Sequence, residues 1–305
     1  MSNSPPDDFS RYLRSKQSVD DRSLNRWVYG QMREALATAP PPDLFQVLEV
    51  GCGIGTMVAR LWDWGLAPRV AYTAIDREAA LVTQAPAELR EFACRQGLEF
   101  SSLGGSVCLR GPGREWLVTF QVADYAQFCQ AQAGPCAWDL LLAHAFLDLV
   151  DLEEALPRLL ALLKPGGLYY FTLNFDGQTI FQPALEPIFE AQVLHLYHQS
   201  MDERQSGRAG HSQTGRRLLA ALCPTGTVLA AGSSDWLVWP QSNGTYPGDE
   251  ANFLAYILET IHRALGSHPD LDQERLQAWL SRRQALIKSG QLIFLAHQLD
   301  LCGRV

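Results

Sequence analysis

Apolar and polar residues follow one another in blocks over much of the chain. Four short apolar runs, bounded by glycine, proline or acidic residues, are typical of buried strands. Amphipathic stretches with apolar residues at helical spacing lie between them. Strands that alternate with helices predict a parallel, doubly wound sheet covered on both faces. The predicted strands cover residues 46–50, 69–75, 137–146 and 164–175, and the predicted helices cover 56–64, 77–95 and 152–163.

Residues 98–122 break that rhythm. They hold two β-rich segments around the turn sequence Arg-Gly-Pro-Gly-Arg at 110–114. Glycine and proline favour tight turns, because one permits positive φ and the other fixes φ. The pattern predicts a hairpin whose second arm is the third strand of the sheet, ending at Asp124.

Residues 1–42 predict a helical segment that precedes the sheet. Apolar residues recur at roughly helical spacing from Val19 to Leu36, and Asp20 or Asp21 is placed to cap this helix. The proline run Pro40–Pro42 ends the segment. The body of the protein then begins at residue 43.

The chain changes character after residue 176. Residues 177–215 are rich in Gln and His, with a helical pattern near their end, and are otherwise hard to assign. Residues 249–289 hold two helical patterns. They lie between two β-rich stretches, 227–240 and 291–301, which predict two further strands.

Charge and cysteine content narrow the class of protein. The 25 basic and 33 acidic residues give a net charge of −8, which disfavours nucleic acid as a partner. The 7 cysteines form no CxxC pair and no cluster with metal-ligand spacing, so reduced thiols and no metal site are expected. Without a targeting leader or an apolar stretch that could cross a bilayer, a cytoplasmic protein with no membrane partner is expected.

Three glycines follow the first predicted strand at every second position. Glu49 ends the apolar run, and Gly51, Gly53 and Gly55 form the loop before the next helix. Glycines let the backbone turn tightly and approach a ligand, while the helix start offers unpaired N–H groups. In a parallel sheet such a loop lies at the ligand crevice, so the sequence predicts a nucleotide-like ligand.

This loop and the acids after the next two strands resemble class I S-adenosylmethionine-dependent methyltransferases. Asp76 ends the second strand, where the resemblance implies a bond to the ribose hydroxyls. Asp124 and Tyr125 match the positions that contact adenine. The resemblance covers residues 46–175 and implies S-adenosylmethionine as cofactor, with S-adenosylhomocysteine as product. The implied cofactor-binding residues are Glu49, Gly51, Cys52, Gly53, Gly55, Asp76, Arg77, Asp124, Tyr125 and His144.

The same resemblance implies an α/β fold with a mostly parallel, doubly wound sheet of seven strands. Residues 227–240 and 291–301 would then be strands six and seven, with a helical insertion between them. One domain is expected over residues 43–305, in which 177–215 and 249–289 are insertions that form a substrate cap. The helical segment 1–42 is expected to act as a lid.

The expected reaction is methyl transfer to a small-molecule acceptor by in-line displacement, for which alignment of the reacting atoms matters most. His144 is the candidate base, and a buried histidine with a purely structural role is an equal alternative. The fourth strand ends in Ala-His-Ala-Phe rather than in the Asn/Asp-Pro-Pro-aromatic signature of enzymes that methylate nucleobase amino groups. The candidate substrate residues are Phe146, Asn174, Asp176, Arg216 and Trp236.

Three alternatives stay open at this point. A nicotinamide-dependent oxidoreductase would use a similar sheet, but the third glycine comes one residue too early for its fingerprint. A related aminopropyl transferase would need a paired-aspartate motif, which we do not find in the sequence. A non-catalytic protein that keeps the fold and binds the cofactor or a partner is the third.

Overall fold

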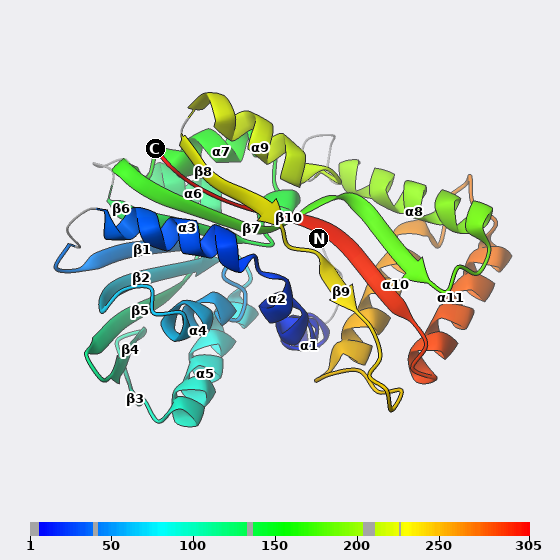
Figure 1. Cartoon of the computed structure of the whole chain (residues 1–305), viewed down its shortest axis with the longest axis horizontal. Helices are drawn as coiled ribbons and strands as arrows, with labels where there is room; N and C mark the ends of the chain where they lie inside the picture. The colour runs from blue at the N-terminus through cyan, green and yellow to red at the C-terminus, as the bar shows by residue number, and fades with distance from the viewer. Residues whose placement is uncertain (1–5, 39–41, 133–136, 204–210, 226) are drawn as a thin grey trace.

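Within the residues that the structure describes, ten strands form one mixed sheet (Figure 1). The structure is a computed structural model and describes residues 6–38, 42–132, 137–203, 211–225 and 227–305. The strands are β1 Phe45–Val50, β2 Arg69–Asp76, β3 Glu99–Leu103, β4 Ser106–Gly111, β5 Arg114–Val122, β6 Trp138–His144, β7 Leu163–Gln182, β8 Thr227–Ser233, β9 Trp236–Val238 and β10 Ile293–Arg304. They lie in the order β3-β4-β5-β2-β1-β6-β7-β10-β8, and β9 pairs with β10.

Helices cover both faces of this sheet. The helices are α1 Pro6–Ser15, α2 Gln17–Ser23, α3 Arg26–Ala37, α4 Thr56–Asp63, α5 Ala79–Gln96, α6 Tyr125–Ala131, the 3-10 turn η1 Leu147–Leu149, α7 Leu152–Leu160, α8 Pro187–Asp202, α9 Thr214–Thr225, α10 Glu250–Leu265 and α11 Gln273–Lys288. One face packs on α3, α4 and α5, around residues such as Met32 and Leu61. The other packs on α6, α7 and α9, around Leu156 and Leu218. Among the described helices, none combines the length and the apolar character that a bilayer crossing requires.

The central strands of the sheet are parallel. β1 pairs with β2 and β6, β2 with β5, and β6 with β7. The winding direction therefore reverses between β1 and β6, and the carboxyl ends of these strands border the ligand crevice of a doubly wound fold. Next to β7 lies β10, antiparallel to both β7 and β8. In the dinucleotide-binding fold, the sixth strand of the chain lies next to the fifth. Here the last strand, β10, takes that place, so this edge of the sheet argues against the oxidoreductase alternative.

The predicted α/β class is confirmed, but the expectation of a mostly parallel, seven-stranded sheet is wrong. β3, β4 and β9 extend the sheet, and five of the strand pairings are antiparallel. The predicted hairpin is also more elaborate than expected. Its first segment divides into β3 and β4 at Gly104 and Gly105, which have φ values of +59° and +85°. Its second arm, β5, is the third strand from the centre, as predicted.

β7 continues past its predicted end at Phe175 to Gln182. Gly177 has a φ of +79° and lies where the β7–β10 register shifts, so the strand bends there without ending. Beyond this bend β7, β9 and β10 form a ribbon that packs on α8, α10 and α11 around Phe181 and Phe294 (Figure 1). Part of the predicted insertion 177–215 is therefore sheet, and its residues 204–210 lie outside the described residues.

Three helices form the described part of the N-terminal segment, where the sequence predicted one. The side chain of Asn25 accepts hydrogen bonds from two first-turn amides of α3 and so caps that helix. The predicted caps, Asp20 and Asp21, lie within α2 instead. Pro40 and Pro41, predicted to end the segment, lie outside the described residues.

Candidate functional site

The glycine loop joins β1 to α4 at the carboxyl end of the central strand. Gly51, Gly53 and Gly55 have φ values of +70°, +53° and +79°, which L side chains rarely adopt. A Cβ at Gly51 would lie 2.3 Å from Phe146 Cδ2, and one at Gly55 would lie 2.9 Å from Phe120 Cε1. Both the backbone angles and the close neighbours therefore require glycine in this loop.

Asp76 holds the glycine loop against the end of β2. Its Oδ2 accepts a hydrogen bond from the N–H of Gly53 at 2.9 Å, and its Oδ1 accepts one from the N–H of Glu78 at 2.9 Å. The N–H of Cys52, a buried residue, donates to the carbonyl of Ile75 at 3.0 Å. Burial raises the pKa of Asp76 above its usual value. The predicted acid therefore lies at the loop and already accepts bonds there.

Glu49 is buried at the end of β1, with 1% of its surface exposed. Successive side chains of a strand point to opposite faces, so Glu49 shares a face with Val47 and with Tyr72 of the neighbouring strand. The Tyr72 hydroxyl donates to Glu49 Oε2 at 2.7 Å. Burial raises the pKa of Glu49 to about 8. At neutral pH this carboxyl is therefore largely protonated, and a nearby cation would favour its ionised form.

Asp124 and Tyr125 lie at the start of α6, after β5. The Asp124 side chain accepts hydrogen bonds from two first-turn amides of α6, so it has a capping role. The rings of Tyr125 and Phe146 meet edge to face, with centroids 5.7 Å apart. Arg77 is exposed and pairs with Glu78 at 3.4 Å. The structure thus joins Tyr125 to the glycine loop through Phe146, while Arg77 points to solvent.

Both ring nitrogens of His144, at the end of β6, have partners. Nδ1 is 2.8 Å from Thr172 Oγ1, and Nε2 is 3.1 Å from an Nη atom of Arg60 and 3.3 Å from Asp20 Oδ2. A guanidinium only donates, so Nε2 accepts from Arg60 and the ring proton lies on Nδ1. Burial lowers the pKa of His144 to about 4. In this arrangement His144 is neutral, and it can accept a proton only after Arg60 withdraws.

Two non-glycine residues with positive φ lie on neighbouring strands, one directly after β6 and the other inside β7. Ala145 has a φ of +49° and donates its N–H to the carbonyl of Thr172. Leu173, inside β7, has a φ of +55° and donates its N–H to Asp300 Oδ1 at 2.8 Å. Backbone strain of this kind persists where the surroundings fix it, and it clusters at functional sites.

Two charged side chains of the N-terminal segment, Lys16 and Asp20, are buried near His144 and pair there with each other and with Arg60 of α4. Lys16 Nζ is 2.9 Å from Asp20 Oδ2, and Arg60 Nε is 2.6 Å from Asp21 Oδ1. Asp20 and Arg60 are 1% and 5% exposed. Burial acts to raise the pKa of Asp20, but the positive charges of Lys16 and Arg60 hold it below its usual value. Asp20 is therefore an ionised carboxylate inside the protein.

Sequence reasoning missed Lys16 and Arg60 and gave Asp20 only a capping role. The available signal was a charged residue on the apolar face of a helix. Arg60 lies among Met57, Val58 and Leu61, all buried. A charge in that position is expensive unless it is paired, which indicates a buried partner.

The residues predicted to face an acceptor do not form one group. Asn174 is fully buried and donates to a carbonyl of β10 at 2.9 Å. Arg216 Nε lies 3.0 Å from Asp176 Oδ1 and 3.1 Å from its Oδ2, so this pair holds α9 to β7 and the charge of Arg216 is already paired. Trp236 Nε1 donates to Asp20 Oδ1 at 2.9 Å. Trp236 therefore joins the group around His144, and Asp176 and Arg216 pair with each other.

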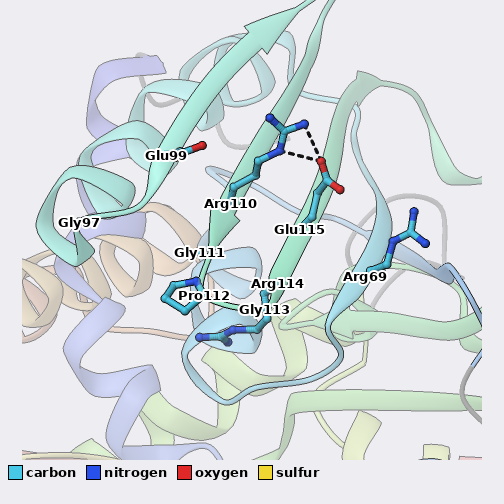
Figure 2. Close-up of a pocket in the computed structure, with 9 residues that line it drawn as sticks. All are labelled: Arg69, Gly97, Glu99, Arg110, Gly111, Pro112, Gly113, Arg114 and Glu115. Carbon is cyan, nitrogen blue, oxygen red and sulfur yellow. Dashed lines mark hydrogen bonds and ion pairs between the residues drawn. The ribbon is translucent and has the colours of Figure 1, made fainter.

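A hollow lies at the end of the sheet opposite to the glycine loop (Figure 2). Arg69 begins β2 and Arg114 begins β5, so this hollow borders the amino ends of parallel strands. Arg110 pairs there with Glu115 at 2.7 Å. Ligands of doubly wound sheets bind at the carboxyl ends, so the glycine loop remains the candidate site.

No protein-family profile matches the chain, and no curated protein matches it. Solved structures resemble it at low identity. A putative type II methyltransferase from Anaeromyxobacter dehalogenans is 20% identical, with a TM-score of 0.47 over 90% of this chain and 95% of that one. Geranyl diphosphate C-methyltransferase from Streptomyces coelicolor is 15% identical, with a TM-score of 0.43 over 92% and 80%.

Phosphoethanolamine N-methyltransferase 2 from Haemonchus contortus is 13% identical, with a TM-score of 0.39 over 91% of this chain. The alignment covers 52% of that enzyme, so the chain spans about half its length. These are distant likenesses. The winding order of the parallel strands, the antiparallel β10 and the glycine loop between β1 and α4 identify a class I, Rossmann-like methyltransferase fold.

Proposed function

We propose that the protein binds S-adenosylmethionine and transfers its methyl group to a small-molecule acceptor. The observation that carries this proposal is the glycine loop after β1, where the strand order of the sheet reverses. At this loop Asp76 accepts a bond from Gly53, and the buried Glu49 lies on the strand next to that of Asp76. A backbone without side chains can lie against a nucleoside, and a carboxylate can accept bonds from a vicinal diol.

The residues present fit such a cofactor. Asp76 would accept from the ribose hydroxyls, and Glu49 would be ionised by the ammonium of the methionine part, directly or through an intervening group. Tyr125 and Phe146 would offer aromatic surface to adenine. When bound, the cofactor supplies a methyl group on a sulfonium. The protein would chiefly align the acceptor with that methyl group and exclude water.

We also propose that the N-terminal segment acts as a lid. A Cβ at Gly53 would lie 3.2 Å from Leu13 Cδ1, so α1 lies next to the glycine loop. Arg14 Nε donates to Glu88 at 2.8 Å and ties α1 to α5. The helices α8, α10 and α11, with residues of the predicted insertions, would form the cap on the acceptor side.

Titration calorimetry with S-adenosylmethionine, S-adenosylhomocysteine and NADH tests the cofactor. The proposal expects micromolar binding of the first two ligands and none of NADH. Binding of NADH alone would overturn it in favour of an oxidoreductase. Binding of the first two without methyl transfer in a broad acceptor screen would favour the non-catalytic alternative.

The variant Asp76→Ala tests the ribose contact. We expect it to weaken binding of S-adenosylhomocysteine by about 1–3 kcal/mol, the scale of lost hydrogen bonds to a charged group. Asp43→Ala, an exposed aspartate before β1, serves as the control. Unchanged affinity in Asp76→Ala would refute the ribose role.

A further inference from the structure

The Asp20 carboxylate occupies a site built by three separate parts of the body. Trp236 of β9 donates its Nε1–H to Oδ1 at 2.9 Å. Arg60 of α4 places an Nη atom 3.5 Å from Oδ2, and His144 of β6 places Nε2 3.3 Å from the same oxygen. Lys16, on the same segment as Asp20, adds its ammonium at 2.9 Å. An N–H donor and two cations therefore converge on one buried carboxylate.

This carboxylate comes from the N-terminal segment, whereas Arg60, Trp236 and His144 belong to the sheet and its helices. Asp20 lies in α2, a helix of 7 residues. If the segment moved outward, Lys16, Asp20 and Asp21 would leave together. The Arg60 guanidinium and the Trp236 N–H would then be left without the carboxylate. A buried guanidinium without a counter-ion is unfavourable, so another anion would be favoured in its place.

We propose that Arg60 and Trp236 form, beside His144, the binding site for a carboxylate group of the methyl acceptor, and that Asp20 holds this site until the acceptor displaces it. This inference rests on the proposed function and names its substrate class. The acceptor is a small organic acid whose carboxylate is anchored beside the end of β6. The atom that receives the methyl group lies elsewhere on that acid or on the carboxylate itself.

The charges around the site favour a monoanion. Lys16 and Arg60 are balanced by Asp20 and Asp21 in the closed arrangement, and His144 is neutral. When α2 moves outward with Lys16, Asp20 and Asp21, Arg60 keeps its single positive charge, and one carboxylate balances it. A phosphate monoester brings close to two negative charges and adds an uncompensated one in a buried place. A neutral amide would leave the Arg60 guanidinium unpaired.

The experiment compares the binding of benzoate, benzamide and phenyl phosphate by ligand-observed NMR titration. Benzamide has the shape of benzoate without its charge. In wild type, Asp20 competes with benzoate. Asp20→Asn removes that competitor, and we expect benzoate to bind about tenfold more tightly to it than to wild type, the scale of one charged hydrogen bond. Benzamide is expected to bind neither protein measurably.

Asp21→Asn is the matched control, because Asp21 also pairs with Arg60 but is 48% exposed at its side chain. An equal gain in benzoate affinity in Asp21→Asn would mean that any lost negative charge has this effect, and would overturn the proposal. Equal affinity for benzoate in wild type and Asp20→Asn would also overturn it. Tighter binding of phenyl phosphate than of benzoate would overturn the assignment to a carboxylate.

A second variant guards against a folding defect in the first. In the Asp20→Asn background, Trp236→Phe removes the N–H donor and keeps an aromatic ring, and we expect benzoate affinity to fall about tenfold. Unchanged affinity would count against the site. S-adenosylhomocysteine is titrated into each protein in parallel. Its failure to bind wild type would overturn the proposed function, whereas the benzoate results bear on the carboxylate site by themselves.

Discussion

Wild type should lose stability as pH rises, and the Glu49→Gln variant should lack this loss. Burial raises the pKa of Glu49 to about 8, compared with 4.5 for an ordinary glutamate. Between these values the unfolded chain releases the proton and the folded chain keeps it. The folded state therefore binds more protons, and the free energy of unfolding falls as pH rises through this window. Glutamine cannot ionise, but its carbonyl can still accept the bond from Tyr72.

The size of this effect follows from the window. Each pH unit in which only the unfolded state is ionised lowers the free energy of unfolding by about 1.4 kcal/mol. Between about pH 5.5 and about pH 7.5 the wild type should lose about 3 kcal/mol relative to Glu49→Gln. Asp300, whose pKa burial raises to about 6, titrates in both proteins and cancels in the comparison.

Urea unfolding of both proteins at a series of pH values measures this difference. Glu91→Gln, at an exposed glutamate of α5, is the control; it keeps Glu49 and should lose stability with rising pH as wild type does. A constant difference between wild type and Glu49→Gln across the window would refute the raised pKa. If Glu49 becomes ionised when the cofactor ammonium binds, wild type should also release a proton on binding. Calorimetry in two buffers of different ionisation enthalpy detects that release, which Glu49→Gln should lack.

Three further variants test other parts of the site. Gly51→Ala should destabilise the protein by more than Gly65→Ala in thermal unfolding, because both have positive φ but only Gly51 has a close neighbour; equal losses would contradict the contact with Phe146. Asp124→Ala should cost about 1 kcal/mol of stability through its lost cap, and unchanged affinity for S-adenosylhomocysteine would refute its adenine role. His144→Ala should lower turnover more than cofactor affinity, and an unaffected rate would exclude it as the base.

The local part of the fold could be predicted from the sequence. Continuous apolar runs placed β1, β2 and β6, and helical spacing placed α4 and α5, to within a few residues, because strands in the middle of the sheet and helices packed on it leave clear apolar patterns. The glycine loop could be predicted for a different reason, because its backbone has positive φ values that few residues other than glycine adopt. β3 and the far half of β7 were missed. Gly177 resembles a strand break in sequence, but a bulge in the β7–β10 pairing accommodates it.

The environment of His144 could not be predicted, because it depends on contacts between distant parts of the chain. Asp20, Arg60 and Trp236 are separated by 40 residues or more, and nothing local to any of them indicates the others. Sequence reasoning could identify a buried charge that needed a partner. The identity of that partner required the structure, and so did the finding that Asp176 and Arg216 pair with each other.

The length of β7 affects how the molecule responds to mechanical or chemical stress. A single strand of 20 residues passes from the core under α6, α7 and α9 into the core under α8, α10 and α11, and β10 runs beside it through both. The two cores therefore share backbone hydrogen bonds rather than a flexible linker. Loss of order in one should spread to the other along this ribbon. A deletion that removes residues 177–215 would also cut through the ribbon and expose the edge of β10, so the segment cannot be excised as a module.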